Sequence, residues 1–435
     1  MRTVKTYSIE DVPLAKHQLQ HWAQQFDEVV WLDSNEYDQT YSSFDAVLAV
    51  DAFLSFTTTT AGAFEYLSEH IQVTRDWLFG YFSYDLKNDV EQLRSTNHDG
   101  LELPDLYFFQ PKRLFFLKGN ALEVHYLNMI DDELEEDVAN LFEILPLDGD
   151  PSHIKTSYEE KPKIKLRIHK DAYHNKINTL LAHIQRGDIY EANFCQEFYA
   201  EDAQIDALQT YLRLNEISSP PFAAFLKIDA HYLLCASPER YLRKEGTKVI
   251  SQPIKGTTKR AKNTAEDKAL KKALREDQKE QSENVMIVDL VRNDLSQTAV
   301  KGSVQVEELC KIYTFKQVHQ LISTVTSEVT PTIDPVALIK STFPMGSMTG
   351  APKVSAMKII EALEETKRGL YSGAVGYFTP ELDFDFNVVI RSILYNADKR
   401  FLSFSVGSAI TGKSTPEREY EECLLKAKAM REVLQ

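Results

Sequence analysis

Two hairpin patterns constrain the fold of this chain more than any other feature of its sequence. In residues 106–127, LYFFQPKRLFFLKGNALEVHYL, a Lys-Gly-Asn turn separates two apolar runs, and in residues 241–252, YLRKEGTKVISQ, the chain turns at Glu245-Gly246. A glycine-containing turn between two such runs is typical of a β-hairpin, whose strands are antiparallel. The sequence therefore predicts antiparallel sheets.

Helical patterns accompany these strands. They cover residues 170–186, residues 264–291 in two pieces, a segment beginning near Pro352 and a last segment that opens at Thr415-Pro416. Long helices beside hairpins predict an α+β protein whose helices pack outside its sheets. Residues 146–163, PLDGDPSHIKTSYEEKPK, are rich in Pro, Gly, Ser and charge. This segment predicts a boundary near residue 150, between an N-terminal sheet-forming region (1–150) and a second region (155–435).

Composition narrows the class of protein. The chain has 435 residues and a formal charge of −16, which argues against nucleic acid as its main partner because phosphate binding favours a basic face. No segment approaches about 18 uninterrupted apolar residues, and the start lacks the apolar stretch of a signal peptide. The four cysteines form no CxxC pair, which suits reduced thiols rather than zinc or disulfides. We expect a cytoplasmic protein with no membrane contact.

Glycine is concentrated in one part of the chain. Five of the 16 glycines fall within 31 residues: Gly346, Gly350, Gly369, Gly373 and Gly376. In residues 343–364, FPMGSMTGAPKVSAMKIIEALE, a Gly-rich turn precedes a helix, whose free N–H groups and dipole favour an anion. The spacing differs from a Walker loop, so a carboxylate suits this turn as well as a phosphate does. The alternative is an ordinary helix start with Pro352 at the first helical position.

Two glutamate pairs have helical spacing. Glu280 with Glu283, and Glu419 with Glu422, are each separated by three residues, which puts both carboxylates of a pair on one helix face. If the two helices converge, four oxygen-donor groups would surround a Mg²⁺ ion that binds an anionic substrate. The alternative is that these residues are ordinary first-turn acids, with Glu422 paired to Lys426 at i+4.

Two further residues suit covalent and acid catalysis. Lys255, in VISQPIKGTTKR, follows a strand between Ile254 and Gly256, and a lysine in an apolar setting has a lowered pKa and can act as a nucleophile. Glu239, in ASPERYL, would be a general acid if it is partly buried. The alternatives are a solvated lysine in a basic turn and an exposed glutamate.

Two residues interrupt apolar segments. His319, in KQVHQLISTV, has apolar neighbours, as a hydrogen-bonded core histidine does. Arg391, in FNVVIRSILY, is a charge in an apolar strand, and its guanidinium suits a carboxylate that belongs to the protein or to a ligand.

Together and in this order, these segments resemble the chorismate-utilising enzymes. The similarity is dense over residues 170–435 and thin over the first 150. It rests on FGYFSYDL from Phe79, GDIYEANFCQEF from Gly187, SPERY from Ser237, PIKGT from Pro253, ENVMIVDLVRNDLS from Glu283, MGSMTGAPK from Met345, SGAVGYF from Ser372, VVIRS from Val388 and EYEECLLKA from Glu419. The resemblance implies two facing antiparallel sheets surrounded by helices, with the active site between the sheets.

The resemblance also implies the site residues. It assigns Glu283 and Glu422 to Mg²⁺, supported through water by Glu280 and Glu419, and the metal would hold the ring carboxylate of chorismate. By the same resemblance, the enolpyruvyl carboxylate would be bound by Tyr377, Arg391 and the Gly407 backbone. Thr349 and Gly350 would belong to a turn that closes the site, and His319 would lie near the ring.

Within this family, the residue before the glycine of the PIxGT motif separates reactions. A lysine there, as at Lys255, resembles enzymes that aminate chorismate at C4 through a covalent lysine adduct, with Glu239 as the acid. The alternative reaction of this family converts chorismate to anthranilate and pyruvate. Two features depart from the family pattern: Glu191 replaces the more usual glutamine, and GSA at residues 407–409 replaces a GxG. No cysteine lies in a glutaminase-type turn, so we expect ammonia to come from a separate glutamine amidotransferase subunit.

Overall fold

The computed structural model describes residues 1–37, 40–59, 61–91, 93–144, 161–315 and 318–435. Both predicted hairpins are confirmed: β5 (Leu106–Lys118) pairs with β6 (Ala121–Leu127), and β11 (Arg240–Glu245) pairs with β12 (Lys248–Gln252). The pairings between the strands of this described part are antiparallel, as the hairpins predict.

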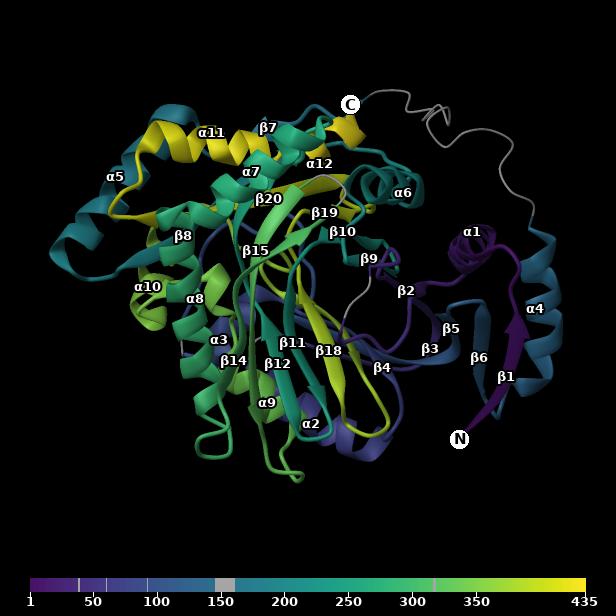
Figure 1. The fold of residues 1–435 in the computed structure, drawn as a ribbon. Coiled ribbons are helices and arrows are strands. Elements are labelled where there is room, and N and C mark those ends of the chain that lie inside the picture. Colours follow the sequence, from purple (N-terminus) through teal and green to yellow (C-terminus); the bar gives the residue numbers. More distant parts are fainter. Residues whose placement is uncertain (38–39, 60, 92, 145–160, 316–317) are drawn as a thin grey trace.

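The strands form two sheets that share β5 (Figure 1). The first sheet leads from β8 to β1 in the following order: β8 (Glu191–Ala200), β20 (Phe401–Thr411), β19 (Ser392–Asn396), β10 (His231–Ser237), β9 (Phe222–Ile228), β2 (Glu28–Asp33), β3 (Ala46–Thr58), β5, β6 and β1 (Arg2–Ser8). Two short strands, β7 (Lys165–Leu166) and β16 (Gly350–Ala351), pair with the free edge of β8.

The second sheet also starts at β5, on the edge that faces away from β3 and that pairs with β6 further along the strand. It continues through β4 (Leu78–Phe82), β17 (Ala374–Phe378), β18 (Phe384–Val388), β11, β12 and β15 (Val318–Glu328). β13 (Ile254–Lys259) follows β12 along one edge of β15, and β14 (Gln305–Thr314) pairs with its other edge.

Alternating side chains show that the two sheets face each other. In β2, Trp31 belongs to a core under the outer helices of the first sheet, whereas its neighbour Val30 belongs to a core that includes Phe79 of β4. In β4 the neighbouring Leu78 belongs to a third core, under the helices of the second sheet. Because successive residues of a strand point to opposite faces, the middle core lies between the sheets. The predicted α+β fold with two facing antiparallel sheets is confirmed.

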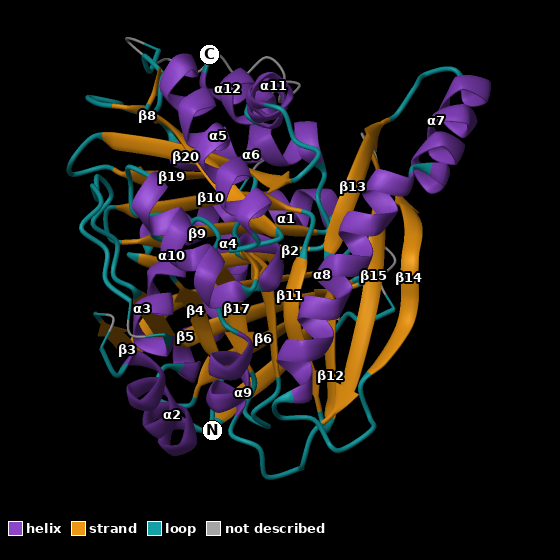
Figure 2. Ribbon diagram, turned by 90° about the vertical axis from the view of Figure 1, so that its left-hand side faces the viewer, coloured by secondary structure: helices purple, strands orange, loops and turns teal. Residues whose placement is uncertain are grey.

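Helices cover the outer faces, as Figure 2 shows for α8 along β13 and β15. The helices that supply the core of the first sheet are α1 (Val12–Trp22), α4 (Leu134–Glu143), α5 (Lys170–Arg186), α6 (Ala207–Ser218), α10 (Lys353–Leu363), α11 (Pro416–Lys426) and α12 (Lys428–Leu434). Those that supply the core of the second sheet are α2 (Ala63–Thr74), α8 (Gln278–Ser296) and α9 (Pro335–Thr342). The two remaining helices are α3 (Lys87–Val90) and α7 (Thr264–Glu276). No helix in the described ranges is both long and apolar enough to cross a membrane.

The helix predictions hold closely. The predicted helix 170–186 is α5, and the stretch 264–291 forms two helices, α7 and α8, which Asp277 separates. Pro416 occupies the first position of α11 as predicted, whereas α10 begins at Lys353, with Pro352 as its N-cap. Short 3₁₀ turns occupy Ala23–Gln25, Tyr84–Leu86, Asp131–Glu133 and Gly346–Met348.

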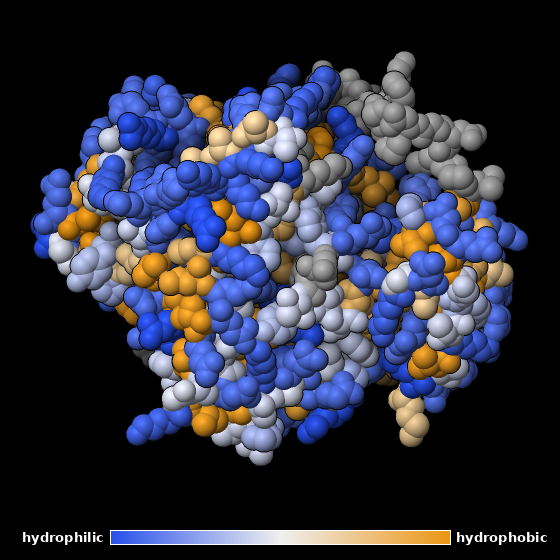
Figure 3. All heavy atoms as spheres, in the orientation of Figure 1, coloured by the Kyte–Doolittle hydropathy of each residue, from blue (hydrophilic) through white to orange (hydrophobic). Residues whose placement is uncertain are grey.

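The predicted boundary near residue 150 lies outside the described residues. The regions on either side of it share both sheets, because β2 pairs with β9 in the first sheet and β4 pairs with β17 in the second. On the face drawn in Figure 3, hydrophilic residues cover most of the surface and hydrophobic ones form separate patches. The buried hydrophobic side chains form three cores.

Candidate active site

α8 and α11 carry the two predicted glutamate pairs, and local sequence sets where each helix begins. The Asp277 carboxylate caps α8 by accepting hydrogen bonds from the backbone N–H groups of Lys279 and Glu280. α11 follows the extended residue Thr415 and has Pro416 at its first position. Each start places one glutamate of a pair in a first turn, where the helix dipole favours a negative charge.

The four glutamates influence one another's ionisation. Burial raises the pKa of Glu280, and the charge of Glu283 raises it further. Burial likewise raises the pKa of Glu419, and the charge of Glu422 adds to this effect. Lys279 feels all four charges: burial lowers its pKa, but the glutamates outweigh burial and raise it. Lys279 therefore links the two pairs electrostatically, and these four glutamates are called the carboxylate cluster below.

Each helix of the carboxylate cluster carries one ion pair between its own residues, four positions apart. Lys279 Nζ lies 3.6 Å from Glu283 Oε1, and Lys426 Nζ lies 2.6 Å from Glu422 Oε1, which is the pair expected at i+4. Burial acts to raise the pKa of Glu422, but the Lys426 ammonium outweighs it, so the pKa lies below its ordinary value. Glu283 Oε1 is a buried atom without a hydrogen-bond partner. This oxygen has an unused capacity to bind a donor or a cation.

The donor set suits a hard divalent cation. Carboxylate oxygens are the ligands that Mg²⁺ prefers, and the buried oxygen of Glu283 is unsatisfied. In the described ranges, no three His, Cys, Asp or Glu side chains are close enough to share one metal ion as they stand. Positive charge among the glutamates is supplied instead by Lys279. The residues fit Mg²⁺ in their chemistry, and the helices present them from opposite sheets.

Lys255 lies on β13 and is paired with Glu191 on β8. Its Nζ donates a 3.2 Å hydrogen bond to Glu191 Oε1, and the side chains are 18% and 2% exposed respectively. Burial lowers the pKa of Lys255, but the charges of Glu191, Glu283 and Glu422 outweigh it and raise the pKa above its ordinary value. The sequence-based expectation of a lowered lysine pKa is therefore wrong for this state. Partners from other elements reverse the effect of burial.

Glu239 has the ionisation that a general acid needs. It is 4% exposed, and burial raises its pKa to about 7, although a hydrogen bond from Ser347 and the charge of Lys255 act in the other direction. Ser347 Oγ donates to Glu239 Oε1 at 2.7 Å. The two residues line a small cavity of about 20 Å³. At neutral pH, a substantial fraction of Glu239 is protonated.

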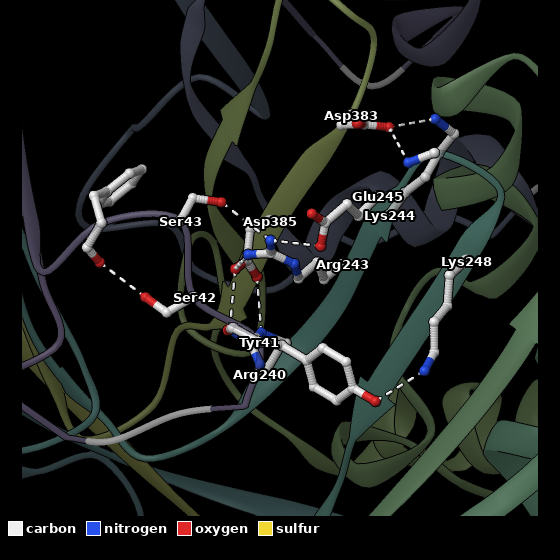
Figure 4. A network of polar contacts seen from close by, with 12 residues as sticks. Tyr41, Ser42, Ser43, Arg240, Arg243, Lys244, Glu245, Lys248, Asp383 and Asp385 are labelled. Atoms are coloured by element: carbon white, nitrogen blue, oxygen red, sulfur yellow. Dashed lines mark hydrogen bonds and ion pairs between the residues drawn. The ribbon is translucent and has the colours of Figure 1, made fainter. Parts of the chain in front are cut away.

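A polar network fixes the strand that follows Glu239 (Figure 4). Arg240 Nε donates to Asp385 Oδ1 at 2.9 Å, and Arg243 Nη1 donates to Asp385 Oδ2 at 3.1 Å. Arg240 also donates to the carbonyl of Tyr41, in the N-terminal region. Since these contacts join three separate segments, they hold the turn that presents Glu239.

The Gly-rich turn packs directly on the strand of Glu191. At Gly350 the backbone φ is +153°, and a Cβ there would lie 2.2 Å from the Glu191 carbonyl oxygen, so only glycine permits this approach. Thr349 is fully buried, and its hydroxyl donates within the turn to the carbonyls of Met345 and Gly346. Thr349 and Gly350 thus shape the turn, which places Ser347 against Glu239.

Arg391 presents a guanidinium that suits an anion. Its Nη1 donates to the carbonyl of Lys426 at 3.2 Å, and it makes no ion pair within the described part of the chain. Burial lowers the pKa of Arg391, which the charges of Tyr371 and Glu422 partly offset. Its backbone φ of +54° is unusual for a non-glycine residue. A substrate carboxylate would satisfy its remaining donors.

Gly407 and Lys426 lie beside this arginine. Lys426 Nζ donates to the Gly407 carbonyl at 2.7 Å while it pairs with Glu422. A Cβ at Gly407 would lie 2.7 Å from Oδ1 of the Asn193 side chain, which would have to shift to admit it. The ammonium of Lys426 therefore links the carboxylate cluster to the region of Arg391.

Two residues named from the sequence lie in other surroundings. Tyr377 packs against Phe44 and Phe79, with ring centroids 5.3 and 5.6 Å away. His319 lies on β15 and is buried, with its Nε2 3.1 Å from Asp267 Oδ1 and its Nδ1 3.0 Å from Thr314 Oγ1. Among the described residues, neither side chain shares a hydrogen bond or an ion pair with Lys255 or Glu239.

Sequence reasoning missed Tyr371 and Lys426 as site candidates. Tyr371 acts electrostatically on Arg391 and is buried, which raises the pKa of its phenol. In the sequence, Tyr371 could have been found from its position directly before the SGAVGYF motif. Lys426 could have been found from its spacing of four residues from Glu422. Lys255, Glu239, the carboxylate cluster and Arg391 form the candidate active site, and their charges suit the class of enzymes that act on an anionic substrate.

Comparisons with known proteins agree with this class. The model of the chorismate binding enzyme family matches residues 22–432, and the chain belongs to this family. The probable chloroplastic aminodeoxychorismate synthase of Oryza sativa subsp. japonica is 33% identical over 421 residues, which are 88% of this chain and 46% of that protein. The chain thus spans about half of the rice protein's length. Aminodeoxychorismate synthase component 1 of Bacillus subtilis is 34% identical over 363 residues, which are 82% of this chain and 76% of that protein.

A solved structure supports the fold. Anthranilate synthase component I from Streptococcus pneumoniae superposes with a TM-score of 0.77 at 24% identity, and the match covers 91% of this chain and 94% of that one. At this identity the likeness concerns the arrangement of the two sheets and their helices.

Proposed function

We propose that this protein aminates chorismate at C4 to give 4-amino-4-deoxychorismate, the precursor of 4-aminobenzoate and folate. The observation that carries the proposal is a lysine and a protonatable acid in one site: Lys255, held in a buried ion pair, and Glu239, with a pKa of about 7. The names of the rice and Bacillus relatives support the same reaction.

The reaction divides into two displacements. Lys255 Nζ bonds to C2, the C1=C2 and C5=C6 electron pairs move to C1=C6 and C4=C5, and the C4–O bond breaks. Glu239 gives its proton to the departing hydroxyl, which leaves as water. Ammonia then bonds to C4, the electron pairs return, the C2–N bond breaks, and the C4 ammonium gives a proton back to Glu239. Covalent catalysis replaces one difficult displacement with two easier ones.

Chorismate has two carboxylates, one on the ring and one on the enolpyruvyl group, and each would be bound by a different set of residues. Glu283 and Glu422 would hold Mg²⁺, with Glu280 and Glu419 supporting it, and the bound ion would act as a Lewis acid that neutralises the ring carboxylate. The enolpyruvyl carboxylate would be bound by hydrogen-bond donors that lie beside the carboxylate cluster, which come from Arg391, Tyr371, Lys426 and the Gly407 backbone. The Thr349-Gly350 turn would close the site. His319 would lie near the ring and would take no part in proton transfer.

Ammonia would come from a separate glutamine amidotransferase. A glutaminase needs a reactive thiolate, and burial raises the pKa of Cys235 to about 11 and raises those of Cys195, Cys310 and Cys423 above their ordinary values. All four cysteines are free thiols, which supports a reducing, cytoplasmic setting.

The decisive experiment identifies the product and the adduct. The protein is mixed with chorismate, Mg²⁺ and ammonium, and 4-amino-4-deoxychorismate is separated from anthranilate and pyruvate, the products of the alternative reaction. Without ammonia, mass spectrometry should find a covalent adduct on Lys255. Lys255→Ala should abolish amination but keep chorismate binding, and Lys255→Arg should not rescue it, because arginine does not deprotonate. Lys259→Ala, on the exposed end of the same strand, is the matched control. Near wild-type amination by Lys255→Ala, or release of anthranilate and pyruvate by the wild type, would overturn the proposal.

A further inference from the structure

Glu191 is a buried carboxylate with one oxygen in use and one oxygen free. Its residue is 1% exposed, Oε1 accepts the hydrogen bond from Lys255 Nζ at 3.2 Å, and Oε2 is buried without a hydrogen-bond partner. A buried carboxylate with an unsatisfied oxygen is costly, so its retention requires an explanation.

The backbone around Glu191 fixes this carboxylate. Its strand β8 is paired on one side with β20, where Thr411 lies opposite Glu191, and on the other side with β16, where Ala351 lies opposite it. The Tyr190 N–H donates to the Ala351 carbonyl at 2.7 Å, and the Asn193 N–H donates to the Thr349 carbonyl at 2.8 Å. The Glu191 side chain therefore projects from a strand with partners on both edges, and its distance to Lys255 is set by the two sheets.

A lysine nucleophile in such an ion pair needs a proton acceptor. The ammonium form of Lys255 has no lone pair, and it cannot attack carbon until one N–H bond breaks. Four carboxylates face Lys255: Glu191 from β8, Glu283 from α8, Glu422 from α11 and Glu239 from the turn before β11. Glu239 is needed as an acid, and Glu283 and Glu422 are the proposed metal ligands. Of the four, Glu191 alone is hydrogen-bonded to the nucleophilic nitrogen.

We propose that Glu191 is the proton acceptor that activates Lys255, a role that rests on the proposed covalent reaction. The Lys255 ammonium transfers one proton along the existing hydrogen bond to Glu191 Oε1, which leaves a neutral amine and a neutral carboxylic acid. The N–H bond breaks, an O–H bond forms, and no other reactant is consumed. The amine lone pair then forms the bond to C2. When the second displacement expels the lysine as an amine, Glu191 returns the proton and the ion pair is restored.

The test is the rate of Lys255 adduct formation in a single turnover with chorismate and Mg²⁺ but without ammonia. Glu191→Gln keeps the size and a hydrogen-bonding oxygen but cannot accept the proton. At pH 7 we expect the variant to form the adduct about 100-fold more slowly than the wild type, a typical contribution of acid–base catalysis. The deficit should shrink as pH rises, because solution base then deprotonates Lys255 directly. Since both proteins contain Glu239, its titration cancels in the ratio of the two rates.

Two variants separate this role from a structural one. Glu197→Gln removes another buried carboxylate of β8, one that pairs with Arg167, and it should not change the adduct rate. Glu191→Asp keeps a carboxylate and should recover part of the rate, which also gives a result if Glu191→Gln does not fold. A Glu191→Gln rate equal to wild type at every pH, or one reduced equally at every pH, would overturn the proposal. If the wild type forms no adduct at all, the proposed function fails, and this inference with it.

Discussion

The hydroxyl of Ser347 donates a 2.7 Å hydrogen bond to the buried carboxyl of Glu239. The two residues come from different parts of the chain, Ser347 from the Gly-rich turn and Glu239 from the turn that the Arg240 network holds. Burial raises the pKa of Glu239 to about 7, while the hydroxyl stabilises the ionised form. Burial and the Ser347 hydrogen bond therefore have opposite effects on the pKa of Glu239, and mutation can change one without the other.

Glu239→Gln should remove a loss of stability that the wild type shows as pH rises from about 4.5 to about 7. The folded pKa of Glu239 is about 7, against an ordinary value of 4.5, so the folded state binds the proton more tightly than the unfolded state. Its contribution to stability is full below pH 4.5 and is lost as pH rises through 7, by about 3 kcal/mol. Glutamine cannot ionise. The melting temperature of the variant relative to wild type should therefore rise between pH 5 and pH 8, whereas Glu381→Gln, at an exposed turn, should show no such trend.

Ser347→Ala should move the alkaline limit of activity upward. Removal of the hydroxyl takes a donor from the ionised carboxylate, so the pKa of Glu239 rises further. A hydrogen bond worth about 1 kcal/mol corresponds to a shift of about 0.7 pH units. The measurement is the rate of adduct formation against pH without ammonia, which keeps the titration of ammonia out of the profile. Ser347→Thr keeps a hydroxyl and should retain the wild-type limit; an unmoved limit in Ser347→Ala would contradict the assignment of Glu239.

Local signals in the sequence predicted the elements well. The apolar spacing over residues 170–186 and the following Gly187, which has a φ of +82°, define α5 without help from tertiary contacts. The glutamate pairs were also predictable, because their i+3 spacing is a property of one helix. What the sequence could not give is the partner of each charge across the sheets.

Lys255 and the tyrosines illustrate this limit. The largest of the charges that oppose the effect of burial on Lys255 belongs to Glu191, 64 positions away on another strand. Similarly, Tyr371 and Tyr377 are six residues apart in one glycine-rich segment, and only the structure separates the tyrosine beside Arg391 from the one in an aromatic core. The strand pairings between the two predicted regions, β2 with β9 and β4 with β17, likewise leave no local mark in the sequence.

Mg²⁺ should be required for turnover and should bind through the carboxylate cluster. EDTA should abolish activity and Mg²⁺ should restore it. Glu283→Gln and Glu422→Gln should each lose most turnover and weaken Mg²⁺ binding in calorimetry, because each replaces a charged carboxylate ligand with a neutral amide. Neither variant should lower the melting temperature greatly. Full activity in a metal-free buffer would rule out the assignment.

Lys279 offers an independent check on the same cluster. Its ammonium supplies positive charge among the four glutamates, so Lys279→Met should tighten Mg²⁺ binding by removing a competing cation. Lys272→Met, on the exposed face of α7, is the control and should leave the affinity unchanged. Weaker binding by Lys279→Met would show that the lysine does not compete with the metal.

The isolated chain should use ammonium salts but not glutamine. Its rate with ammonium should increase with pH where NH₃ becomes available, until ionisation of Glu239 limits the reaction. Addition of a glutamine amidotransferase subunit should then permit use of glutamine, which is measured as glutamate release coupled to product formation. Useful glutamine hydrolysis by the pure chain would contradict the proposal that ammonia has a separate source.

The pair Tyr371 and Tyr377 tests which tyrosine belongs to the substrate site. Tyr371 acts on Arg391, whereas the ring of Tyr377 packs on Phe44, Trp77 and Phe79. Tyr371→Phe removes a hydroxyl near the proposed carboxylate site, and the KM for chorismate should rise by about tenfold, which matches a hydrogen bond to a charged group of about 1.5 kcal/mol. Arg391→Ala should raise KM further, because it removes the charge itself. Tyr377→Phe should leave KM near wild type and change mainly the melting temperature. The reverse pattern, with KM sensitive to Tyr377 and not to Tyr371, would restore the sequence-based assignment and place the enolpyruvyl carboxylate elsewhere.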